Sequence, residues 1–128
     1  MSFKAKFTAA GITRNILVVD YGMIQQTDAT GRPSSVSRGG KITLTVEGTG
    51  ATDLFEWMTN SFERKDGSIT FVKRDSDATL KELKFKEAYI VKYTEDFDST
   101  SDNPLTETFI LSAKEIELGN AKHTNEWV

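Results

Sequence analysis

The sequence has no cysteine and a single histidine among its 128 residues. The absence of cysteine excludes disulfides, thiolate nucleophiles, iron–sulfur centres and thiolate zinc sites. The single histidine, His123, lies five residues from the C-terminus, which leaves the serines without a nearby partner base and excludes histidine-rich metal sites. We therefore expect no catalytic residues, no metal site and no cofactor, and a protein that is not an enzyme.

Surplus positive charge and long hydrophobic runs are missing as well. Sixteen Lys and Arg against 19 Asp and Glu give a net charge of −3, which argues against a nucleic-acid partner because phosphate binding depends on clustered cations. No segment approaches the roughly 18–20 apolar residues of a membrane span, and the start of the chain does not resemble a secretory signal. We expect a cytoplasmic protein without membrane insertion that leaves the cell, if at all, by another route.

Alternation of apolar and polar residues with period two dominates the chain, and this pattern is typical of half-buried strands. The length fits a single domain spanning residues 1–128 with one core. The expected strands lie near residues 3–8, 16–24, 41–47, 68–74, from 79 through 83–93, and 105–118. Between Leu83 and Tyr93 the apolar side chains occupy odd positions, with Glu87 as the polar exception.

Two features interrupt the alternation. Leu54, Phe55, Trp57 and Met58 fit one face of a short helix that begins at Thr52 or Asp53 and ends near Asn60, with Glu56 in a capping-box-like position. In the last strand the apolar positions change phase, which predicts a bulge near Lys114. Together the elements predict a mainly β protein, a small antiparallel β-barrel or sandwich with one short α-helix.

Several motifs resemble chemical sites without completing them. The Gly39-Gly40-Lys41 segment lacks the other residues of a phosphate loop. The run Asp96, Asp98, Thr100, Asp102 and Glu107 has calcium-loop spacing but lacks the glycine at the sixth position. A pair of carboxylates for glycoside hydrolysis would need burial to raise the pKa of one of them. The acidic residues of this chain lie on predicted loops and strand faces, where we expect them to be exposed to solvent.

Segments dispersed along nearly the whole chain resemble the haemolysin-coregulated protein family, Hcp (TssD), in its Bacteroidetes form. The resemblance is carried, in this order, by Ser2–Phe7, Thr27–Val36, Leu54–Met58, Lys73–Asp77, Leu83–Phe85 and Leu105–Phe109. It implies a small β-barrel that assembles into homohexameric rings, which stack into the tube of a type VI secretion system. The implied partners are further copies of the chain, a contractile sheath, a VgrG-like spike protein and secreted effectors held in the lumen. The resemblance also implies export by that system without a signal peptide.

Two loops and the tail are the candidate assembly sites. The turn-rich segment Asp28–Gly40 is long enough to indicate a function, and we expect it to reach an adjacent subunit or ring. Pro33 and Val36 would supply apolar contacts, while Arg32 or Arg38 would pair with carboxylates. The residues of this predicted loop site are Asp28, Arg32, Pro33, Val36 and Arg38, and those of the acidic connector are Glu95, Asp96, Asp98 and Asp102. Trp127, in an otherwise polar tail, is expected to dock on its own barrel or on a neighbouring subunit.

A second function remains open at this point. A monomeric barrel or sandwich that binds a small ligand or carbohydrate would need an unfilled interior, and Tyr21, Tyr89, Tyr93 and Trp57 are the candidate cavity residues.

Overall fold

The structure is a computed structural model that describes residues 3–127. Seven strands and one helix occur in this range. In chain order they are β1 (Phe3–Ala9), β2 (Ile12–Tyr21), β3 (Lys41–Glu47), α1 (Asp53–Thr59), β4 (Lys65–Lys73), β5 (Thr79–Phe97), β6 (Leu105–Leu118) and β7 (Ala121–Thr124).

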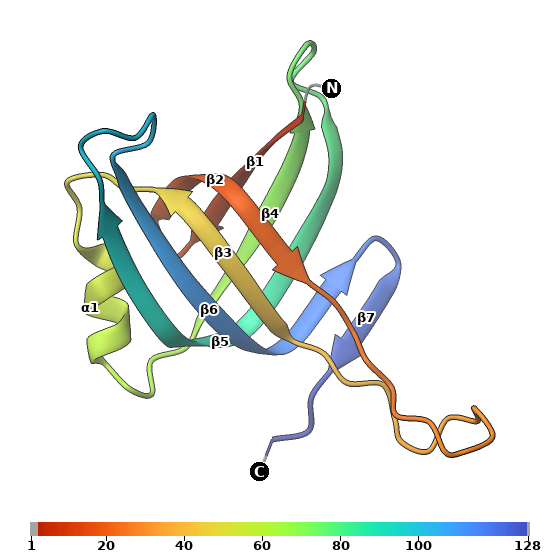
Figure 1. The fold of residues 1–128 in the computed structure, drawn as a ribbon. Helices are drawn as coiled ribbons and strands as arrows, with labels where there is room; N and C mark the ends of the chain where they lie inside the picture. The colour runs from red at the N-terminus through yellow and green to blue at the C-terminus, as the bar shows by residue number, and fades with distance from the viewer. Residues whose placement is uncertain (1–2, 128) are drawn as a thin grey trace.

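The strands form one antiparallel sheet that closes on itself (Figure 1). The strand order is β3-β2-β1-β4-β5-β6-β7, and additional pairing of β3 with β6 joins the two sides of the sheet. Residues 41–47 of β3 pair in continuous register with residues 106–112 of β6. Six strands therefore make the closed barrel and β7 extends beyond it, which confirms the predicted fold class.

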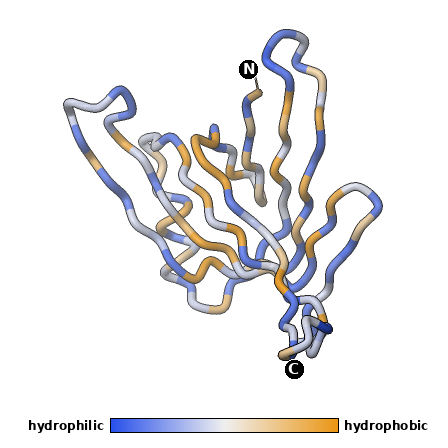
Figure 2. Tube along the Cα trace, turned by 45° about the vertical axis from the view of Figure 1, so that its right-hand side comes forward, coloured by the Kyte–Doolittle hydropathy of each residue, from blue (hydrophilic) through white to orange (hydrophobic). Residues whose placement is uncertain are grey.

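Aromatic and aliphatic side chains fill the barrel. Three phenylalanines are in contact at its centre: the Phe7 ring centroid lies 5.9 Å from that of Phe85 and 5.3 Å from that of Phe109. Figure 2 shows the matching pattern, with hydrophobic positions alternating along the strands and hydrophilic ones at the exposed turns. The other large apolar residues that are less than 2% exposed are Ile42, Leu44, Val46, Leu54, Trp57, Ile69, Leu83 and Leu111.

The inward face changes phase twice in β5, and the prediction for this region was partly wrong. Leu83 and Phe85 are buried as expected, but Ala88 and Ile90 follow them into the core, and Val91 is 47% exposed. The first change occurs at Glu87, whose φ is +51°, and the second is a register shift between Ile90 and Lys92. Each extra residue turns the following side chains to the other face.

The irregularity predicted near Lys114 of β6 is accompanied by one at the opposite residues of β5. The buried face of β6 changes phase between Ala113 and Ile116, as the sequence indicated. The pairing with β5 nevertheless keeps its register across this point, from Lys86–Glu115 to Ala88–Ala113. Both strands therefore add a residue at the same place, so a bulge confined to β6 is wrong.

The helix has the predicted position and begins after one of the two predicted N-cap residues, but without the expected capping bond. Thr52 is the N-cap residue and makes no side-chain capping bond, because its hydroxyl donates to the carboxylate of Glu56 instead. Leu54 and Trp57 are buried against the barrel, whereas Phe55 remains 55% exposed and packs edge-on against Tyr93. The four apolar residues therefore do not share one buried face.

Three predicted boundaries also shift. Strand β2 ends at Tyr21, so the apolar residues Met23 and Ile24 lie outside it. Strand β5 continues to Phe97, which places the first half of the acidic connector in a strand. The tail is not wholly irregular, because β7 pairs with residues 115–118 of β6.

Gly67 in β4 is a position where the barrel leaves no room for a side chain. A Cβ atom there would lie 2.2 Å from the Thr8 carbonyl oxygen and 2.6 Å from the Phe85 ring. We expect Gly67→Ala to lower the free energy of unfolding by roughly 1–3 kcal/mol, as overpacking does. Denaturant unfolding measures this at fixed protein concentration, and Gly50→Ala is the control because nothing lies within 4 Å of that position. Equal stability of the two variants would contradict the packing argument.

Candidate assembly surfaces

Residues 22–40 form an arm that projects from one end of the barrel (Figure 1). The arm is a narrow hairpin rather than an irregular loop, since Ile24 and Arg38 exchange both backbone hydrogen bonds, at 2.8 and 2.7 Å. A second bridge joins Thr27 and Pro33. Ile24 and Val36 are 68% and 77% exposed, so the arm presents apolar side chains that the barrel does not cover.

Asp28 closes the tip of the arm. Its carboxylate accepts hydrogen bonds from the Thr30 hydroxyl at 2.7 Å and from the backbone amides of Thr30 and Arg32 at 2.8 and 3.1 Å. These bonds, that from the Thr30 hydroxyl above all, lower the pKa of Asp28 below its ordinary value. Asp28 therefore shapes the tip, and its negative charge is held by the arm itself.

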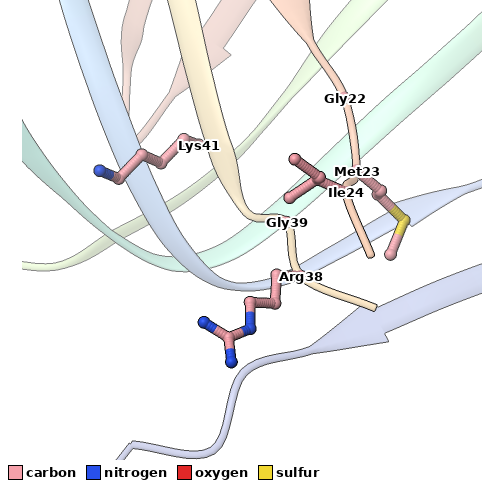
Figure 3. A pocket seen from close by; sticks show the side chains of 6 residues that line it. All are labelled: Gly22, Met23, Ile24, Arg38, Gly39 and Lys41. Carbon is pink, nitrogen blue, oxygen red and sulfur yellow. The ribbon is translucent and has the colours of Figure 1, made fainter. Parts of the chain in front are cut away.

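A shallow pocket lies at the root of the arm (Figure 3). Met23 and Ile24 line it from the β2 side, and Arg38 and Lys41 line it from the β3 side. Apolar and cationic groups thus occur together on this end of the molecule.

The acidic connector lies on and beyond the far end of β5. Glu95 and Asp96 belong to the strand, and the turn to β6 holds Asp98 and Asp102. Asp98 repeats the bonding of Asp28, accepting from the Thr100 hydroxyl at 2.7 Å and its amide at 3.0 Å, which lowers the pKa of Asp98. Glu95, Asp96, Asp98 and Asp102 are all exposed.

The register of β3 places the arm and the acidic turn at opposite ends of the barrel. Lys41, at the arm root, pairs with Ser112 of β6, whereas Glu47 pairs with Thr106, next to the acidic turn. A strand of seven residues separates these ends by about 20 Å at the usual rise per residue. The predicted loop residues and the predicted connector residues therefore do not meet within one chain.

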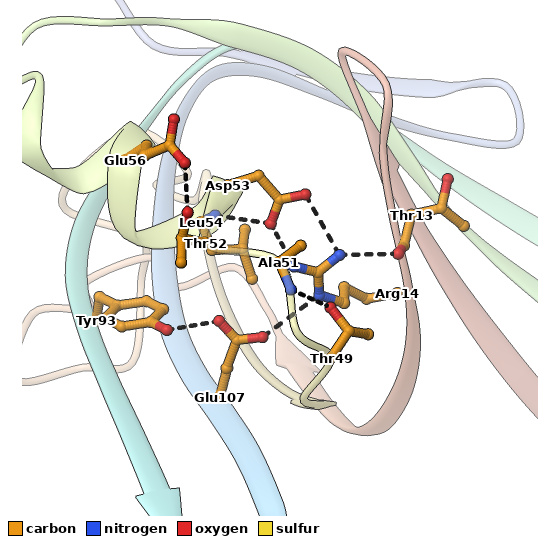
Figure 4. A network of polar contacts seen from close by, with 10 residues as sticks. All are labelled: Thr13, Arg14, Thr49, Ala51, Thr52, Asp53, Leu54, Glu56, Tyr93 and Glu107. Atoms are coloured by element: carbon orange, nitrogen blue, oxygen red, sulfur yellow. Dashed lines mark hydrogen bonds and ion pairs between the residues drawn. The ribbon is translucent and has the colours of Figure 1, made fainter.

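The structure also contains a buried ionic cluster that the sequence reasoning missed (Figure 4). The Arg14 guanidinium donates to Asp53, at the start of α1, and its Nε lies 3.4 Å from Oε1 of Glu107. The Tyr93 hydroxyl donates to the other oxygen of Glu107 at 2.5 Å. Glu107 is 1% exposed, contrary to the expected solvation of the acidic side chains. The sequence contained one signal of this burial, because Glu107 alternates with Phe109 and Leu111 on the inward face of β6.

The same cluster bears on the calcium-like spacing. Glu107 would supply the twelfth position of such a loop, but it faces the barrel interior and is bonded to Arg14 and Tyr93. Within residues 3–127 no group of three or more acidic or histidine side chains is arranged to hold a metal ion.

The four aromatic residues of the ligand-binding alternative lie in different surroundings. Trp57 is buried and its indole donates to the Glu63 carbonyl at 2.9 Å. Tyr93 is bonded to Glu107, Tyr21 lines a surface pocket beside the arm, and Tyr89 packs against Trp127 with ring centroids 5.4 Å apart. This last contact lies within one chain.

Comparison with known proteins supplies the family. The model of the haemolysin-coregulated protein Hcp (TssD) family matches residues 1–128. The chain belongs to this family. Hcp1 from Flavobacterium johnsoniae is 60% identical in sequence, with 95% of this chain and 99% of that chain covered and a TM-score of 0.92.

More distant structures share the fold. Hcp1 from Salmonella typhimurium is 11% identical over 97% of this chain and 93% of that chain, with a TM-score of 0.77. The PVC sheath/tube terminator structure of an extracellular contractile injection system matches at 20% identity over 91% of this chain and 93% of that chain, with a TM-score of 0.61. No curated protein matches the chain.

These findings identify a tube protein of type VI secretion and favour it over the ligand-binding alternative. The family consists of secreted structural tube proteins that assemble with one another. In the part of the chain that the structure describes, no helix has the length and apolar character needed to cross a membrane.

Removal of Glu107 is expected to destabilise the barrel strongly. In Glu107→Ala the buried Arg14 guanidinium loses a partner, and breaking such a pair costs about 3–5 kcal/mol of unfolding free energy. Replacing both residues, as Arg14→Met with Glu107→Leu, should recover more than half of that loss because no buried charge is left uncompensated. Denaturant unfolding measures both variants, and a double variant as unstable as Glu107→Ala would contradict this account.

Tyr93 is expected to resist ionisation. Burial and the neighbouring Glu107 carboxylate raise its pKa above the ordinary value of 10.0. The folded chain holds this proton more tightly than the unfolded chain, so the contribution to stability is complete below pH 10 and declines as the pH rises above it.

Ultraviolet titration of tyrosinate absorbance should show that one of the three tyrosines ionises late. This late component should be missing in Tyr93→Phe. A wild-type titration that shows no late component would be inconsistent with the buried Tyr93–Glu107 bond.

Proposed function

We propose that the chain is the subunit of a homohexameric ring, and that these rings stack head to tail into a tube propelled by sheath contraction. The observation that carries the proposal is the placement of two unlike surfaces at opposite ends of β3, in a chain of the Hcp family. Head-to-tail stacking requires two different surfaces that face opposite directions and fit each other.

The charges of the two surfaces are complementary. The arm, residues 22–40, carries Arg32 and Arg38 against Asp28, whereas residues 95–103 carry four carboxylates and no Lys or Arg. In a stack, the arm of one ring would approach the acidic turn of the next, so its arginines would pair with Asp96 or Asp102. Asp98 is engaged with Thr100 and is less available.

The apolar residues of the arm support the same arrangement. Val36 at 77% exposure and Ile24 at 68% are large aliphatic side chains whose burial against a neighbour would contribute about 1.5–3 kcal/mol each. Phe97, next to the acidic turn, is 72% exposed and offers a matching apolar surface. We also propose that Trp127, which packs against Tyr89 of its own chain, contacts a neighbouring subunit within the ring.

The remaining partners follow from the role of such a tube. We propose that a sheath surrounds the rings, that a VgrG-like spike caps them and that effectors travel in the lumen. The subunit would reside in the cytoplasm before contraction and act without catalysis, its function being the geometry of the assembly.

The first test is the native mass of the purified protein by light scattering, followed by negative-stain microscopy. Six-subunit rings are expected. A monodisperse monomer at high concentration would contradict the proposal.

A charge exchange tests the stacking contact. Arg32→Glu with Arg38→Glu should leave rings intact and abolish their stacking, because these residues shape the arm through backbone bonds and their side chains remain free for a neighbour. Adding Asp96→Lys and Asp102→Lys to that variant should restore stacking. Tube length by electron microscopy at low and high salt is the measurement, and stacking of the double arginine variant at wild-type length would exclude the proposed contact.

A further inference from the structure

The C-terminal tail reaches the root of the arm through one side chain. Asn125 donates from its Nδ2 atom to the carbonyl oxygens of Gly39 and Ala113, both at 3.0 Å. Its backbone amide donates to the Lys114 carbonyl at 2.7 Å. Asn125 therefore joins the arm, strand β6 and the tail at a single point.

The Asn125 side chain is fixed from its other side as well. Its Oδ1 atom lies 3.0 Å from Nε2 of His123. The bonds to Gly39 and Ala113 place the amide nitrogen on their side and leave Oδ1 facing His123. Because an amide oxygen can only accept, Nε2 of His123 carries the donated hydrogen. The only histidine of the sequence thus holds the orientation of the amide.

The root of the arm is shaped for this contact. Gly40 has a φ of +100°, and a Cβ atom there would lie 2.5 Å from Nδ2 of Asn125 and 2.6 Å from the Ala113 carbonyl oxygen. The Gly40 carbonyl accepts from the Ala113 amide at 2.8 Å. Glycine gives the root the close approach that the tail needs, and it also leaves the arm with little torsional restraint of its own.

The tail has anchors of its own on both sides of Asn125. Before it, β7 pairs with β6 from Leu118–Ala121 to Glu115–Thr124. After it, the Trp127 ring packs against Tyr89. Asn125 is therefore held on the barrel while it binds the arm.

We propose that Asn125, oriented by His123 and anchored by β7 and Trp127, is the positioning residue that sets the direction of the arm. This inference rests on the proposed function in one respect, that the direction of the arm decides whether it meets the next ring. A hairpin that leaves the barrel through glycines needs an external restraint to keep one direction, and Asn125 supplies two hydrogen bonds at that point.

The test compares Asn125→Ala with Glu126→Ala, a control on the exposed neighbouring residue. Hydrogen exchange of peptides covering residues 22–40 is measured on unstacked rings, so that arm mobility is recorded without ring contacts. We expect roughly tenfold faster exchange at the Ile24 and Arg38 amides in Asn125→Ala, corresponding to the loss of one or two net hydrogen bonds. Glu126→Ala should exchange like the wild type. Trp127→Ala, which removes an anchor without touching the arm, should show a smaller increase and serves if Asn125→Ala does not fold.

Arm exchange at the wild-type rate in these variants would overturn the inference, whatever happens to the tubes. Tube growth is read separately: faster exchange with lost stacking supports both proposals. Faster exchange with unchanged stacking leaves Asn125 as a restraint on the arm and contradicts the role of the arm in stacking.

Discussion

Closure of the sheet by β3–β6 pairing is the constraint on which the rest of this structure depends. Continuous register from Lys41–Ser112 to Glu47–Thr106 satisfies the backbone groups of both strands and encloses a single interior. Because β3 is short and β5 and β6 are long, closure also leaves hairpins that extend past the barrel at opposite ends. The same hydrogen bonds that stabilise the fold therefore place the two candidate assembly surfaces.

Closure has a cost inside the barrel, where Glu107 lies among apolar side chains. Its charge is compensated by Arg14 and by the Tyr93 hydroxyl, and Arg14 also binds Asp53 at the start of α1. The helix, which contributes only Leu54 and Trp57 to the core, is thus joined to the barrel by an ionic contact as well as by packing. A buried pair of this kind contributes little net stability but makes alternative placements of the helix unfavourable.

The two segments that project from the barrel are held by hydrogen bonds within each turn and not by packing against the core. The arm and the acidic turn are closed by similar hydrogen bonds, which the Thr30 hydroxyl donates to the Asp28 carboxylate and the Thr100 hydroxyl donates to the Asp98 carboxylate. Turns closed by their own side chains need no contact with the barrel, so the other side chains of the arm and of the acidic turn remain exposed to other molecules. The arm root differs because Asn125 connects it to the tail, which makes the C-terminus a part of the assembly surface.

Alternation in the sequence was sufficient to predict six of the strands and an antiparallel barrel or sandwich, because period-two burial is a local property of each strand. The helix was predicted where the alternation is interrupted, and the choice of a barrel was implied by the resemblance to the Hcp family. The sequence also revealed the resemblance to the Hcp family, through several short segments that occur in the same order. The phase change near Lys114 was predicted from the sequence, but the matching change at Glu87 and the burial of Glu107 were not. The sequence also carried no signal for the Asn125 contact. These features join residues far apart in the chain, and only the closed barrel decides which of them face one another. Local pattern thus determined the elements, while the register of β3 against β6 decided their interior partners and the opposite placement of the two ends.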